Sequence, residues 1–249
     1  MVRVNDSLNS LLHNAFRHSL EFLTSSETLL VLAVVAGSIC IGIPLAIGHF
    51  VSRVRNPEEL LKEQSDFNEG HAALLAHEFD CREWLRYHGF KFVWAFRFGD
   101  TSSVVWARDG LPMRFFTIQR ARGVTSFEFC TEFDDALPLN LNTVSRKVAF
   151  VLPRPPGMFI QSITHFSIED TWRIHLDSEA FLIQKFNITS KPSTLAIRES
   201  FLKSVRIQAE YTCSLRLWHI RAIYWYGIKR FIMANRTVEQ QRLPTSLRH

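Results

Sequence analysis

Two groups of histidines and acidic residues are the densest candidates for chemistry in this 249-residue sequence. Both fall in segments whose apolar spacing predicts helices. The first contains His71, His77, Glu78, Asp80 and His88, and the second contains His165, Asp170, His175 and Glu179. On a helix His175 and Glu179 share a face, as do His71 and Glu78 two turns apart. Either pair could supply two metal ligands, whereas a protein metal site normally has three or four.

The polarity of solvated helices explains both groups more simply. Glu169 and Asp170 follow Ser167 and suit the positive N-terminal end of a helix dipole. No Gly-rich phosphate loop, nucleophile elbow, H-E-x-x-H sequence or kinase motif is present. We therefore predict no metal and no cofactor, and the catalytic residues of an enzyme, if it is one, are not identifiable. If the domain has a polar pocket, His165, His175 and Glu179 are its candidate lining.

A third candidate is a basic, aromatic segment near the C-terminus, residues 215–231. Its apolar residues recur at helical spacing: Leu217, Ile220, Tyr224, Ile228 and Phe231. The residues expected to contact a membrane surface are Arg216, Trp218, Arg221, Trp225, Lys229 and Arg230. Trp beside Arg and Lys is typical of a helix lying in the membrane interface, and the central Arg221 argues against a second span. The competing interpretation is a helix packed on the domain with solvated basic residues.

The element that would bring this segment close to lipid is an apolar run from Thr28 to Gly48 without an ionisable side chain. Twenty helical residues rise about 30 Å, the thickness of the hydrocarbon core. We predict a single transmembrane helix over residues 29–48. Cations cluster after it, at Arg53, Arg55 and Lys62, so the larger C-terminal part should be cytoplasmic. Small residues spaced four apart within the run could also allow two spans to associate.

The C-terminal part is organised around the segment 90–98, in which every second residue is aromatic: Phe90, Phe92, Trp94, Phe96 and Phe98. In a regular strand these five side chains lie on one face. We interpret this aromatic face as the domain core, covered by helices. The alternative is that part of it lines a pocket for an apolar ligand. An RNA-binding sheet would expose its aromatics and would follow a different order of elements.

Further strands are predicted at 102–108, 112–120, 124–133 and 139–144. Tight turns such as Asp109-Gly110 join them, so the five strands should form an antiparallel meander. Helices are expected from Asn56 to about Ser65, resuming to Tyr87 before Gly89, from Ser167 to about Asn187, and from Ser193 or Thr194 to about Met233. Residues 145–166 contain a Pro-rich stretch and are expected to be irregular.

The composition indicates the charge of a binding partner but does not identify the partner. The net charge of +5 and pI near 9.2 favour an anionic partner, which could be lipid headgroups or nucleic acid. The four cysteines are far apart, without a C-x-x-C pair, which favours reduced thiols over a disulfide framework or a zinc site.

We thus predict an α+β protein with an N-terminal tail (1–28), a transmembrane helix (29–48), a cytoplasmic domain (56–233) and a basic flexible tail (234–249). The function expected is a membrane-anchored, non-catalytic binding or interaction module. The alternative is an enzyme or apolar-ligand carrier with its pocket against the aromatic face. The expected partners are membrane lipid and a protein or second copy of the chain, rather than nucleic acid.

Overall fold

The computed structural model describes residues 56–63, 75–76, 80–121, 123–134, 139–146, 153–192 and 195–244, with isolated positions between 28 and 48. Its contacts divide the chain into two units, Met1–Ala46 and Ile47–His249. Most of the predicted span lies outside the described residues, and the positions described within it are helical. Among described residues, no helix has both the length and the apolar character needed to cross a membrane. The span therefore remains a prediction.

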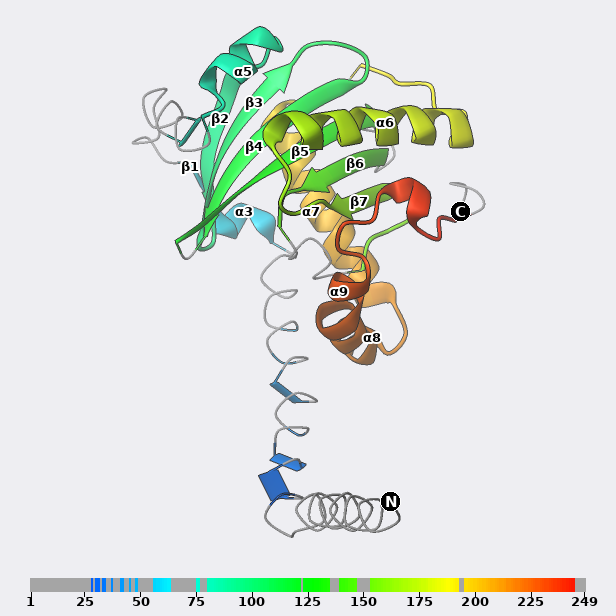
Figure 1. The fold of residues 1–249 in the computed structure, drawn as a ribbon. Helices are drawn as coiled ribbons and strands as arrows, with labels where there is room; N and C mark the ends of the chain where they lie inside the picture. The colour runs from blue at the N-terminus through cyan, green and yellow to red at the C-terminus, as the bar shows by residue number, and fades with distance from the viewer. Residues whose placement is uncertain are drawn as a thin grey trace, which may run out of the picture. The chain divides into compact units, whose positions relative to one another are not determined.

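The second unit is a mixed α+β fold built on one seven-stranded sheet (Figure 1). The strands are β1 (Leu61–Glu63), β2 (Lys91–Phe98), β3 (Thr101–Arg108), β4 (Met113–Ala121), β5 (Val124–Asp134), β6 (Leu139–Val144) and β7 (Met158–Ser162). They lie in sequence order, and all neighbours are antiparallel except β6 and β7. The predicted α+β class and the meander from β2 to β6 are confirmed.

Two strands differ from the sequence prediction. The first predicted helix ends early: α3 covers Pro57–Leu60, and the chain continues as β1, which pairs with β2. Residues 145–166 are not irregular throughout, because β7 lies within them and pairs in parallel with β6. Between β3 and β4 the chain makes a longer loop, from Asp109 to Pro112, rather than the two-residue turn expected at Asp109-Gly110.

Helices cover both faces of the sheet. On one face, α5 (Arg82–Tyr87) and α6 (Ile168–Phe186) pack on a core that includes Phe116, Phe129 and Trp172. On the other face, α7 (Ile197–Ser214) contributes Leu202 and Phe201 to a second core. Figure 1 shows α6 in front of the sheet and α7 behind it. We call these two surfaces the α6 face and the α7 face.

The aromatic residues of β2, with Phe90 just before it, do not share one face, contrary to the prediction. Phe90 and Phe92 belong to the core of the α6 face, whereas Trp94, Phe96 and Phe98 belong to that of the α7 face. The cause is an irregularity in the pairing of β2 with β3 between Phe92 and Trp94. One extra residue in a strand exchanges the faces of every residue that follows. The aromatics of one strand therefore serve two cores.

Local signals set the ends of the helices beside the sheet. The Ser167 hydroxyl accepts a hydrogen bond from the Asp170 amide and caps α6, as predicted. At its other end Asn187 adopts a left-handed conformation with φ 50°. Gly89 has φ 75° just after α5, where it was expected to end the helix. α7 begins at Ile197 without a side-chain cap, and Ser193 and Thr194 lie outside the described residues.

After α7 the chain forms α8 (Trp218–Tyr224), a π-helical stretch η2 (Trp225–Lys229), α9 (Arg230–Ile232) and a short 3-10 helix η3 (Val238–Gln240). We expected residues from 234 onward to be loose, but up to residue 244 the structure differs. The Asn235 amide donates to the Ser162 carbonyl at 2.7 Å, and Val238 is fully buried. The cause is an apolar core, in which Val238 and Leu243 pack with Leu182 and Phe159. Residues 245–249 lie outside the described chain.

Candidate functional site

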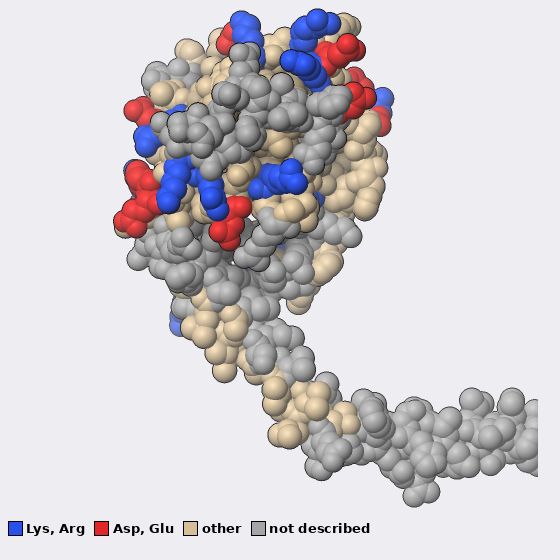
Figure 2. Space-filling view, turned by 90° about the vertical axis from the view of Figure 1, so that its left-hand side faces the viewer, with Lys and Arg blue, Asp and Glu red and all other residues tan. Residues whose placement is uncertain are grey.

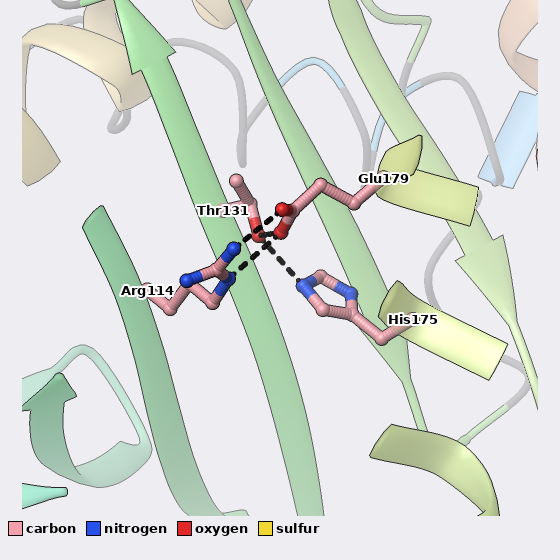
Figure 3. A network of polar contacts seen from close by, with 4 residues as sticks. All are labelled: Arg114, Thr131, His175 and Glu179. Atoms are coloured by element: carbon pink, nitrogen blue, oxygen red, sulfur yellow. Dashed lines mark hydrogen bonds and ion pairs between the residues drawn. The ribbon is translucent and has the colours of Figure 1, made fainter. Parts of the chain in front are cut away.

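The structure brings His175 and Glu179 together with two strand residues, as Figure 3 shows. The Arg114 guanidinium donates two hydrogen bonds to the Glu179 carboxylate, at 2.9 and 2.6 Å. The Thr131 hydroxyl donates to Glu179 Oε2 at 2.8 Å and lies 2.8 Å from His175 Nε2. The helix α6 and the strands β4 and β5 thus position one polar cluster between sheet and helix.

The cluster continues across the sheet to the C-terminal segment. His175 Nδ1 lies 2.7 Å from the Thr143 hydroxyl of β6, which accepts a hydrogen bond from Gln161 Nε2 of β7 at 2.8 Å. The Gln161 side-chain oxygen accepts from the Ser178 hydroxyl and from the Val238 amide, both at 3.0 Å. We call this set the buried polar network. The sequence did not indicate its strand members, because isolated Thr and Gln residues in strands carry no distinguishing pattern.

Apart from the Arg114 side chain, which is 18% exposed, the network is buried. Thr131, Thr143, Gln161 and His175 are fully buried, and Glu179 is 5% exposed. Burial, with a smaller effect of the Arg114 charge, lowers the pKa of His175 to about 3. The imidazole is therefore neutral at ordinary pH. Its partners are protein groups, and through them the network holds α6 to four strands.

The other predicted ligands do not join this cluster. His165 is exposed, and it adopts a left-handed conformation with φ 70°. Of the first group, His71, His77 and Glu78 lie outside the described residues. His88 stacks on the ring of Trp84, with ring centroids 4.1 Å apart. Within the described part of the chain, no three metal-ligating side chains converge.

The basic, aromatic segment exposes its apolar side chains. The apolar stripe consists of residues just before α8 and along α8, η2 and α9 that are 47–63% exposed: Leu217, Ile220, Tyr224, Ile228, Phe231 and Ile232. If the segment were an ordinary amphipathic helix packed on the domain, these residues would face the core. Large apolar side chains that are exposed at regular helical spacing indicate an interaction surface.

Basic residues and tryptophans flank the apolar stripe. Arg216 and Arg221 are exposed, and Trp218, Trp225 and Lys229 are half-buried. The Lys229 ammonium lies over the Trp225 ring, 3.2 Å from its centroid, and burial lowers its pKa to about 8. It therefore still carries its charge at neutral pH. Arg230 begins α9, but its side chain lies outside the description.

The segment is held in place at both ends. It follows α7, whose Phe201 and Leu202 pack on the sheet. It is followed by Asn235, whose side-chain oxygen accepts hydrogen bonds from the Thr164 amide and hydroxyl at 2.7 and 3.0 Å. Trp218 also lies beside Gly48. Its indole is so close that a Cβ atom added to the glycine would lie 3.4 Å from it. The start of the segment is thus adjacent to the last residue of the predicted span.

A cavity of about 280 Å³ lies between the α7 face of the sheet and α7 itself. One wall is apolar and is formed by Trp94, Phe96, Val105, Phe115, Ile197 and Phe201. The other is polar and is formed by Gln119, Glu128, Cys130, Asn140, Asn142 and Arg154. We call it the α7 cavity. It touches two residues of the expected aromatic face, Trp94 and Phe96, and it lies on the opposite side of the sheet from His175 and Glu179.

No family model, curated protein or solved structure matches this chain.

The charged side chains on one surface of the domain do not gather by sign. On the face of the domain shown in Figure 2, Lys and Arg side chains are interspersed with Asp and Glu, so the described residues there form no extended basic surface.

Cys81, Cys130 and Cys213 are free thiols, and Cys40 lies outside the described residues. Burial raises the pKa of Cys81 to about 12 and that of Cys130 well above its usual value. Neither is therefore an activated nucleophile.

Proposed function

We propose that this is a single-span membrane protein whose cytoplasmic domain is a non-catalytic binding module that rests on the anionic membrane surface through the segment from Arg216 to Ile232. The observation that carries the proposal is the exposed apolar stripe with basic residues and tryptophans beside it. An interfacial helix has this composition, because apolar side chains enter the headgroup boundary while cations remain at anionic lipid.

The location of the segment favours lipid over a protein partner. If residues 29–48 span the bilayer, Gly48 lies at its surface. Trp218, beside Gly48, then lies at the same level, where Trp is commonly found. The described apolar residues of the span, Leu30, Val31, Val34, Ile41 and Leu45, are 60–68% exposed, as lipid-facing side chains would be. Their exposure supports the span, and the cations after it support a cytoplasmic domain.

A binding role is favoured over a catalytic one by the buried polar network. His175 and Glu179 are the acid–base pair that the sequence offers, and both are committed to protein partners away from solvent. A general base must reach the proton that it removes, directly or through one water. Neither residue is placed to do so.

The membrane contact is tested with a fragment of residues 56–249, which lacks the span. We expect it to co-sediment with vesicles containing phosphatidylglycerol, to bind pure phosphatidylcholine weakly, and to be released by salt, which screens the charges. Each basic residue near the surface contributes about 1 kcal/mol. Replacing Arg216, Arg221, Lys229 and Arg230 by Gln should therefore abolish binding.

The matched control removes the same number of charges elsewhere. Arg82, Arg86, Lys91 and Arg173 are exposed and lie outside the segment, and their replacement by Gln should leave binding nearly unchanged. Both variants should melt at the temperature of the unmodified fragment. If a fragment with an unchanged melting temperature ignores anionic vesicles at low salt, the proposal is wrong. Dimerisation that is lost in Phe231→Asp would instead assign the stripe to a second copy of the chain.

A further inference from the structure

The polar wall of the α7 cavity contains three buried atoms that lack a hydrogen-bond partner among the described residues. They are Oδ1 of Asn140, Oδ1 of Asn142 and Nε of Arg154. Leaving one buried polar group unpaired costs about 1–3 kcal/mol, and such groups are rare in native structures. Two acceptors and one donor of this kind line a single cavity. Their gathering there indicates a bound molecule that supplies both donors and an acceptor.

The charges of this wall are already opposed to one another. The carboxylates that line the cavity are those of Glu128, Glu132 and Asp134, and the cations are Arg154 and Lys203. Glu128 and Arg154 act electrostatically on each other, and Lys191 pairs with Asp134 at 2.8 Å, so that positive and negative charges at the cavity balance. Burial lowers the pKa of Arg154 and raises that of Glu128, the latter despite the opposing effects of Arg154, Arg146 and the Gln119 hydrogen bond. A charged ligand would lose its hydration on entering this cavity. The described residues at the cavity, Lys191 included, carry no excess of opposite charge that would compensate for that loss. The wall therefore favours an uncharged ligand.

The sheet register relates the polar wall to the apolar one. Phe115 on β4 pairs with Cys130 on β5, which pairs with Asn142 on β6. Neighbouring strands are about 4.8 Å apart, so Phe115 and Asn142 are separated by roughly 10 Å. On the apolar side, the Trp94 and Phe96 rings stack with centroids 4.0 Å apart, and the Phe201 ring of α7 lies 4.9 Å from that of Phe96. Flat rings fit beside such a cluster.

We infer that the α7 cavity binds a small uncharged molecule with a flat apolar body and a polar group that both donates and accepts hydrogen bonds, such as a carboxamide. The body packs against Phe115, which belongs to the same apolar cluster as Phe96 and Phe201. Its polar group donates to the Asn140 and Asn142 oxygens and accepts from Arg154 Nε. A two-ring body with one such group has the length that the register requires.

Three probes with the same body separate the parts of this inference: 2-naphthamide, 2-naphthoate and naphthalene. Binding to the full chain in detergent is measured by equilibrium dialysis against matched micelles without protein. We expect 2-naphthamide to bind at least about tenfold more tightly than the other two, because only it satisfies the unpaired atoms without adding a charge. No membrane surface takes part, so this result is independent of the proposed lipid contact.

Variants then locate the binding. Asn142→Leu and Arg154→Met should each reduce the affinity for 2-naphthamide about tenfold and leave that for naphthalene nearly unchanged. Arg173→Met, which removes an exposed arginine from α6, should change neither affinity. Ser204→Phe, which adds a ring to the α7 wall, should abolish binding of all three probes.

The inference is overturned by any of three results obtained with folded protein. The first is tighter binding of 2-naphthoate than of 2-naphthamide, which would mean a site for anions. The second is unchanged 2-naphthamide affinity in both Asn142→Leu and Arg154→Met. The third is the absence of binding by all three probes to the unmodified chain. Melting curves confirm that each variant is folded, and the Asn142 variant decides if Arg154→Met does not fold.

Discussion

His175 donates a hydrogen bond to Thr131. The two side chains are 2.8 Å apart, and the single hydroxyl proton of Thr131 is directed at Glu179, so its oxygen must accept from His175 Nε2. On the other side of the ring, a neutral imidazole with its hydrogen on Nε2 has an acceptor at Nδ1, so the Thr143 hydroxyl donates to Nδ1 while it accepts from Gln161. A neutral imidazole with its hydrogen on Nε2 satisfies every partner. A second proton on Nδ1 would meet the Thr143 proton.

This arrangement predicts a loss of stability in acid. The pKa of His175 falls from 6.5 to about 3 on folding, so between about pH 6.5 and pH 3 the unfolded chain binds up to one more proton than the folded chain. Stability from this residue is complete above pH 6.5 and is lost as the pH falls towards 3. The expected slope is up to about 1.4 kcal/mol per pH unit. Denaturant unfolding of the detergent-solubilised protein measures it.

The variant His175→Gln provides the control for this slope. It should be less stable than the unmodified protein at neutral pH, because the network loses a partner. Its stability should nevertheless fall less steeply between about pH 6.5 and pH 5, because Gln does not titrate. Arg114 and Glu179, which also face the imidazole, remain in both proteins. Equal slopes in the two proteins would mean that His175 is not neutral in the folded state.

The ion pair between Arg114 and Glu179 gives a second prediction. The side chains are 18% and 6% exposed, so removing one partner leaves a buried charge without compensation. Glu179→Met should cost about 3–5 kcal/mol in the free energy of unfolding. The double variant Arg114→Met, Glu179→Met should recover most of that loss, since apolar residues of similar size often replace a buried pair at little cost. A double-mutant cycle with Arg114→Met completes the measurement, and additive losses would refute the coupling.

Most of the meander could be predicted because strong local signals agree. Alternation and turn residues between the apolar runs predict β2 to β6, and the Ser167 cap predicts the start of α6. β7 carries no alternation, since all its residues from Met158 to Ser162 are buried. The irregularity after Phe92 also left no trace in the sequence, because aromatic residues occupy the core positions on both sides of it.

The sites were predictable only where their members lie close in the sequence. His175 and Glu179 are one helical turn apart, and the apolar stripe repeats at helical spacing. Their partners come from distant strands: Thr131 precedes His175 by 44 residues and Arg114 precedes Glu179 by 65. Arg154 stands in a Pro-rich stretch that suggested only irregular backbone, and its place in the α7 cavity depends on the parallel pairing of β7.

The last prediction compares two phenylalanines in which the same substitution should affect different properties, stability in one case and vesicle binding in the other. Phe116 is fully buried in the core of the α6 face, and Phe231 is 57% exposed in the apolar stripe. Phe116→Ala should lower the free energy of unfolding of the 56–249 fragment by about 3–5 kcal/mol, because a large cavity remains. Phe231→Ala should change it by less than about 0.5 kcal/mol.

For vesicle binding we expect Phe231→Ala to have the larger effect and Phe116→Ala the smaller one. Phe231→Ala removes apolar surface that enters the headgroup boundary, and should weaken binding to anionic vesicles about tenfold, a change of about 1.4 kcal/mol. Phe116→Ala, measured at a temperature where the fragment remains folded, should bind as the unmodified fragment does. A large loss of stability in Phe231→Ala, with unchanged vesicle binding, would show that the stripe is packed on the domain and does not contact lipid.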